Sequence, residues 1–174
     1  MACMFIKGMR RIGHLMKSLF LLLLTCLTSF AADFKATNTG IEIGAGSLGT
    51  FTLTYPEFEP AHKIIEVKAA AASAMVSYEG GAQCVISAGK DEIIALFSNV
   101  PAEVKSWKMT TLIDIGFAKG GSWQIGDKTG VFPAEKASPP HIASLNGTTF
   151  LVKNAQGQSL SIQTPDYAFQ QLTD

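Results

Sequence analysis

Three residues in a glycine-rich segment offer the clearest binding chemistry in this sequence. Trp123, Gln124 and Asp127 lie in the run KGGSWQIGD, residues 119–127. An indole presents a flat apolar face, and a nearby amide and carboxylate can hydrogen-bond hydroxyl groups, a combination that suits a sugar ring. These three residues, on a flexible loop, are therefore the candidate carbohydrate-binding site. The alternative is that Trp123 and Ile125 close the end of a hydrophobic core.

Paired carboxylates, which hydrolyse glycosidic bonds, are the second chemistry considered. Glu57 and Glu59 lie in a proline-flanked loop and would point the same way from an extended chain. Glycosidases hold two such groups across a cleft, one of them with a raised pKa. Exposed loop glutamates are more commonly surface charge, and Asp114 is expected to face solvent, opposite the Trp107 face of its strand. No Gly-x-Ser-x-Gly nucleophile motif is present, so the catalytic residues stay unknown.

Metal and thiol chemistry have little support in the sequence. His62 and His141 are isolated, and no spacing typical of zinc ligands is found, so neither a metal site nor a cofactor is expected. A structural calcium near Asp127 stays open, although its surroundings match no dedicated calcium loop. Cys84 lies in an alternating segment and is expected to be a small buried hydrophobe.

The N-terminal segment has the composition of a secretory signal peptide. Four basic residues and no acidic one precede the apolar run LFLLLLTCL, residues 19–27, and small residues follow. We expect a signal peptide over residues 1–31, cleaved after Ala31 or Ala32, and a secreted or periplasmic product. The run LLTC resembles a bacterial lipobox, so lipid anchoring at Cys26 is the alternative.

Cleavage would change the charge of the protein. All 14 acidic residues but only 10 of the 14 basic residues follow the leader, which gives the mature chain a net charge of 10 − 14 = −4 and no arginine. A nucleic-acid-binding protein needs a concentrated basic surface. Nucleic acid is therefore excluded as a partner, and after signal removal no membrane association is expected. The mature chain would retain Cys84 alone and could form no internal disulfide.

The elements that position these residues are expected to be strands. Residues 49–56, GTFTLTYP, alternate apolar and polar side chains between a glycine and a proline, as a half-buried strand requires. Residues 74–78, 83–87 and 92–97 predict a meander joined by tight turns, residues 107–115 alternate again, and residues 148–153 and 158–164 predict a hairpin. Such spacing is typical of an all-β, antiparallel β-sandwich with a jelly-roll-like arrangement. One domain over residues 33–174 is expected, alone or as the N-terminal part of a longer protein.

Three stretches carry a resemblance to a known class of domain. They are residues 41–56, the run GGSWQIGD at 120–127, and residues 149–162. Together they resemble N-terminal, accessory β-sandwich domains of secreted bacterial carbohydrate-active enzymes. The resemblance implies a module that binds or helps to process polysaccharide, non-catalytic on its own, with a polysaccharide or oligosaccharide as partner. The alternatives are an N-terminal fragment of a glycoside hydrolase or polysaccharide lyase, and a structural or protein-interaction module of the envelope.

Overall fold

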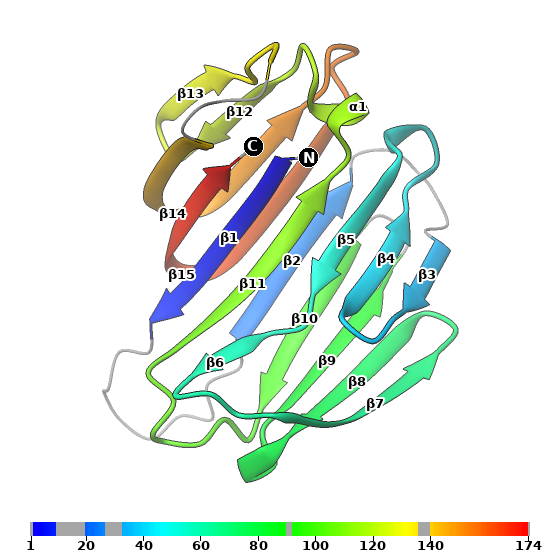
Figure 1. Ribbon diagram of the computed structural model, residues 1–174, viewed down its shortest axis with the longest axis vertical. Helices are drawn as coiled ribbons and strands as arrows, with labels where there is room; N and C mark the ends of the chain where they lie inside the picture. The colour runs from blue at the N-terminus through cyan, green and yellow to red at the C-terminus, as the bar shows by residue number, and fades with distance from the viewer. Residues whose placement is uncertain (1, 10–19, 27–32, 90–91, 136–139, 174) are drawn as a thin grey trace.

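The protein is an all-β, antiparallel, sandwich-like structure. The computed structural model describes residues 2–9, 20–26, 33–89, 92–135 and 140–173, with the backbone alone at 2–9, 20–26, 47 and 165–167. Every strand pairing in these ranges is antiparallel, and the one α-helix described is the four-residue α1 (Ile115–Ala118) (Figure 1). The fold class predicted from the alternating sequence is confirmed. None of the helices in the described ranges has the length and apolar character to span a membrane.

The strands follow one another with short connections. In chain order they are β1 (Ala2–Met9), β2 (Phe20–Cys26), β3 (Asp33–Ala36), β4 (Gly40–Gly44), β5 (Thr50–Thr54), β6 (Glu57–Glu59), β7 (Ile64–Ala70), β8 (Ser73–Tyr78), β9 (Gln83–Ala88), β10 (Glu92–Ser98), β11 (Ser106–Ile113), β12 (Ser122–Ile125), β13 (Lys128–Val131), β14 (His141–Lys153) and β15 (Ser159–Thr173).

The strands form a sheet that curls over itself. Its main path runs β3-β4-β5-β11-β1-β15-β2-β10-β9-β8-β7, and β14, β12 and β13 extend from β15. Aromatic contacts join strands that are distant along this path. Phe58 of β6 lies 4.8 Å from Tyr78 of β8, and Phe97 of β10 lies 5.2 Å from Trp107 of β11, between ring centroids. The part of the sheet that contains β6 and β11 therefore faces the part that contains β8 and β10 across a shared core, and β4 and β5 pass across β9 and β10 in Figure 1.

Alternation along the strands supplies that core. Phe51 and Leu53 of β5 are each 1% exposed, while the threonines between and beside them are exposed or half-buried, as residues 49–56 predict. The predicted meander is confirmed as β8, β9 and β10. Cys84 is completely buried in β9, where burial raises the pKa of its thiol above the ordinary value.

The strand that carries Trp107 also follows its predicted alternation, except at Thr110, which is buried on the opposite face, and at Ile115. Trp107, Met109 and Ile113 are buried on the predicted face of β11. Ile115, expected on the same face, is 58% exposed because the strand ends at Ile113 and α1 begins at Ile115. Asp114 is exposed, as predicted, and caps this helix by accepting a hydrogen bond from the Gly116 amide at 2.6 Å.

The C-terminal hairpin is longer than the sequence predicts. β14 begins at His141 and β15 continues to Thr173, with an irregular register between Gly147 and Thr149. The turn is held by Asn154, whose Oδ1 accepts from the amides of Gln156 and Gln158 at 3.1 and 2.8 Å. Such a side chain takes the place of a backbone acceptor in a tight turn.

Two strands lie within the range for which the sequence predicts a signal peptide. β1 pairs with β11 on one side and β15 on the other, and β2 pairs with β10 and β15. Figure 1 shows β1 lying between β11 and β15. This pairing does not test cleavage, so the signal peptide over residues 1–31 stays a prediction.

Candidate functional site

The glycine-rich segment forms a short hairpin at one edge of the sheet. β12 and β13 pair across the turn Gly126–Asp127, where Gly126 has a φ of +57°. The other side of β12 pairs with β14, whereas β13 pairs with β12 alone, so β13 is an edge strand. The expectation of a flexible loop around Trp123 is therefore wrong: the glycines shape the ends and turn of a hairpin, and Trp123 itself lies in a strand.

Trp123 lies on the core-facing side of this hairpin. It stands opposite Val152 of β14 and Gly130 of β13, and its next neighbour on the same face is the fully buried Ile125. A methyl group at position 130 would overlap Cζ2 and Cε2 of the indole, so the ring covers the glycine backbone. Trp123 is half-buried and packs against the core, the arrangement that the core-closing alternative expects.

The indole nitrogen of Trp123 has no hydrogen-bond partner. Its Nε1 is buried, and no acceptor lies within reach among the described residues. An unsatisfied buried donor costs about 1–3 kcal/mol, and each instance in a folded protein calls for an explanation. Because this atom is buried, a ligand acceptor can satisfy it only after the ring or its neighbours move.

Gln124 lies on the other face of β12 from Trp123, and Asp127 lies in the turn that follows this strand. Gln124 is exposed, and its Nε2 donates to the Gly126 carbonyl at 2.8 Å. Asp127 is also exposed, in the turn itself. Because successive strand residues point to opposite faces, Trp123 and Gln124 do not share one face of the hairpin. The candidate residues surround the hairpin tip instead of lining one face.

The carboxylates considered for hydrolysis have structural partners. Glu57 forms an ion pair with Lys108 at 3.1 Å, and Glu59 accepts a hydrogen bond from the Ser106 hydroxyl at 2.9 Å. Both glutamates are exposed on β6, on the same side of the strand. This arrangement matches the interpretation of Glu57 and Glu59 as surface charge.

The histidines and acidic residues of the described ranges form no cluster of metal ligands. His62 has its Nδ1 2.8 Å from the Glu79 carbonyl oxygen. Within the described ranges, no group of three or more histidine, cysteine, aspartate or glutamate residues could hold a metal ion. A structural calcium near Asp127 stays a prediction.

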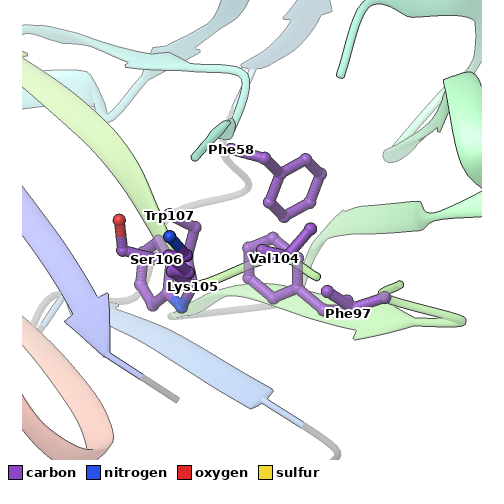
Figure 2. Close-up of a pocket in the computed structure, with 7 residues that line it drawn as sticks. Phe58, Phe97, Val104, Lys105, Ser106 and Trp107 are labelled. Carbon is purple, nitrogen blue, oxygen red and sulfur yellow. The ribbon is translucent and has the colours of Figure 1, made fainter. Parts of the chain in front are cut away.

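A small apolar pocket lies between β6, the end of β10 and the start of β11 (Figure 2). Its lining includes Phe58, Phe97 and Trp107, together with Val100, Val104, Lys105 and Ser106. Its cavity volume is about 10 Å³, which admits one water molecule at most. The pocket is therefore a packing gap and not a site for a sugar.

Sequence reasoning missed a second group of unusual residues. Trp107 Nε1, Gln170 Oε1 and the Tyr78 hydroxyl are buried without hydrogen-bond partners among the described residues, and burial raises the pKa of Tyr78. Gln170 is completely buried, with its Nε2 donating to the Gly147 carbonyl at 3.2 Å. Nothing in the local sequence marks these positions, because their burial depends on strands that are distant along the chain.

Comparison with known proteins adds no assignment. The chain matches no protein-family model, no curated protein and no solved structure. The side chains of the β12–β13 hairpin are therefore the basis on which a function can be proposed.

Proposed function

We propose that the protein is a secreted, carbohydrate-associated β-sandwich module that contacts polysaccharide through the β12–β13 hairpin and is non-catalytic on its own. The observation that carries this proposal is Trp123: a half-buried aromatic ring on an edge hairpin, with a buried indole donor that lacks a partner. Aromatic rings with one apolar and one polar end are typical of sites that bind ligands of mixed polarity.

The polar residues at the turn supply the second part of the contact. Gln124 directs its Nε2 to the Gly126 carbonyl, so its side-chain amide is oriented before any ligand binds. Its Oε1 can accept from a sugar hydroxyl, and the Asp127 carboxylate can accept from another. A polysaccharide chain is long enough to contact the ring and the turn at the same time. A single sugar lying on one face of the hairpin is too short to do so.

The proposed environment follows from the leader. A product cleaved after Ala31 or Ala32 would reach the periplasm or the medium, where polysaccharide is accessible. The net charge of −4 after cleavage favours neutral or cationic polysaccharides over strongly acidic ones, because like charges repel at the approach.

Affinity electrophoresis of the secreted protein in gels that contain plant or algal polysaccharides tests the proposal. We expect at least one neutral polysaccharide to retard the protein. The affinity for that polysaccharide should fall about tenfold or more in Trp123→Ala and about two- to tenfold in Gln124→Ala or Asp127→Asn. Because Trp123 also packs against the core, Trp123→Phe serves as the conservative comparison.

The control variant is Gln156→Ala, which removes an exposed glutamine side chain from the β14–β15 turn, at the opposite end of β12 from the Gly126–Asp127 turn. It should leave retardation unchanged. Absence of retardation by every polysaccharide, or equal retardation of Gln124→Ala, Asp127→Asn and the unaltered protein, would overturn the assignment of this hairpin.

A further inference from the structure

The two strands in the predicted leader hold central positions in the sheet. β1 is the connection between β11 and β15, and β2 is the connection between β15 and β10. Cleavage after Ala31 or Ala32 would remove both. β15 would then retain β14 as its partner, β11 would retain β5 and β6, and β10 would retain β9. Three groups of strands would be left with unpaired edges facing one another.

These edges cannot simply close into the same kind of sheet. β1 runs antiparallel to both β11 and β15, so β11 and β15 are parallel to each other, and the same reasoning makes β15 parallel to β10. Direct pairing would introduce parallel ladders with a different hydrogen-bond geometry into a sheet whose described pairings are all antiparallel. It would also require each group of strands to move by about 4.8 Å, the width of one strand.

In the register of the sheet, the residue types of β1 do not complement two buried polar atoms of β11 and β15. In the register of the sheet, Ile6 stands opposite Gln170 and Gly8 stands opposite Trp107. Gln170 Oε1 and Trp107 Nε1 are two of the buried atoms without partners. Isoleucine and glycine have no side-chain group that could satisfy either atom.

The register also places two residues of like charge opposite each other. Lys7 stands directly opposite Lys108 of β11, and like charges directly opposite on neighbouring strands are destabilising. Lys108 already forms an ion pair with Glu57 at 3.1 Å, so an acidic residue at the position of Lys7 would join an existing pair instead of opposing it. A strand with other residue types than those of residues 2–9 would therefore complement β11 and β15 better.

We propose that the position between β11 and β15 is a strand-accepting groove that, once the leader is removed, binds an extended segment of a partner polypeptide by restoring the sheet between these two strands. The partner strand runs antiparallel to both neighbours and is about eight residues long. It carries apolar residues opposite Ile113 and Leu172, a hydroxyl or amide side chain opposite Gln170 and opposite Trp107, and an acidic residue opposite Lys108. Main-chain hydrogen bonds supply the affinity, and the alternating side chains supply the specificity.

Synthetic peptides can test this groove on the unaltered protein. The chain is expressed with its own leader, the secreted product is purified, and its N-terminus is determined by mass spectrometry. One peptide has the sequence of Ala2–Met9, and a second carries Ile6→Thr, Lys7→Glu and Gly8→Ser. A third adds Phe5→Pro to the second, because proline removes a ladder hydrogen bond from a central strand. Hydrogen exchange is measured for the segments that form β11 and β15.

We expect a product without residues 1–31. In it, the amides of β11 and β15 that face the position of β1 should exchange rapidly until a peptide is added, while the amides that pair with β5, β6 or β14 stay protected. The substituted peptide should protect both strands and bind at least about tenfold more tightly than the leader peptide, and the proline peptide should protect neither. Two further peptides that carry Ile6→Thr alone or Lys7→Glu alone separate the contributions: in a Gln170→Leu protein the advantage of the first should disappear while the advantage of the second persists.

Four results would overturn the proposal. They are residues 2–9 retained in the secreted product, protection without any peptide of the β11 and β15 amides that face the β1 position, no protection of these amides by any peptide, and equal binding of the proline peptide and its parent. None of them depends on carbohydrate binding at the β12–β13 hairpin, so the two proposals fail separately.

Discussion

Gly130 lies directly opposite Trp123 in the β12–β13 pair, and the indole occupies the space that a side chain at position 130 would need. The ring is thereby held against the backbone of the edge strand. An aromatic residue covering a cross-strand glycine also shields backbone that would otherwise be exposed on a strand of low intrinsic stability.

Gly130→Ala should therefore displace the Trp123 ring and destabilise the protein. We expect a loss of about 1–3 kcal/mol in the free energy of unfolding, because the added methyl group overlaps the indole in a packed region. Urea unfolding measures the change. Gly147→Ala is the matched control, since a methyl group there meets its nearest neighbour at 3.7 Å and should cost about 1 kcal/mol or less. Equal losses in the two variants would contradict the contact.

Asn154→Ala should destabilise the β14–β15 hairpin. The substitution removes the acceptor for two backbone amides, and we expect a loss of about 1–3 kcal/mol in the free energy of unfolding. Asn154→Asp keeps the acceptor oxygen and should lose less. Thermal or urea unfolding of both variants distinguishes the role of the oxygen from a general effect of substitution at this position.

Cys84 should make stability fall in alkaline solution. Burial raises the pKa of the thiol in the folded protein, so the unfolded chain ionises first, near the ordinary value of 9.0. The stabilisation is complete below that pH and is lost as the pH rises above it, at up to about 1.4 kcal/mol per pH unit. Urea unfolding at pH 8 and pH 10 should show a smaller decrease in Cys84→Ala than in the unaltered protein. An identical decrease in the two proteins would show that groups other than Cys84 cause the loss of stability.

Asp114→Ala should remove the cap of α1. The carboxylate accepts from the Gly116 amide at 2.6 Å, and loss of an N-cap costs about 0.5–2 kcal/mol. Glu135→Ala, at another exposed acidic position, controls for the change in net charge and should leave the free energy of unfolding almost unchanged. A loss no greater than that of the control would show that the cap contributes nothing.

Local patterns in the sequence predicted the strands whose side chains alternate strictly. Phe51 and Leu53 of β5 and Trp107 of β11 are buried where the pattern places them, because a strand with one buried face needs that alternation. The pattern could not predict that Gly130 would stand opposite Trp123, since register depends on which strands meet and where their turn begins.

The same limit applies to the buried polar residues. Gln170 is completely buried although glutamine is ordinarily a surface residue, and its burial is produced by neighbouring strands that are remote in the sequence. The glycines around Trp123 were interpreted as loop residues because glycine commonly marks loops. Here they form the turn of a hairpin and the surface on which the indole lies.

The free edge at β7 bears on how the protein behaves at high concentration. The register of β7 against β8 shifts between Ile64 and Glu66, which leaves Ile65 as an extra residue, 64% exposed, and Glu66 and Lys68 form an ion pair at 3.1 Å on the same strand. A bulge and charged side chains prevent an exposed strand from serving as a template for further strands. Deleting Ile65 would remove the bulge and leave a more regular exposed edge, so we expect this variant to aggregate more readily than the unaltered protein.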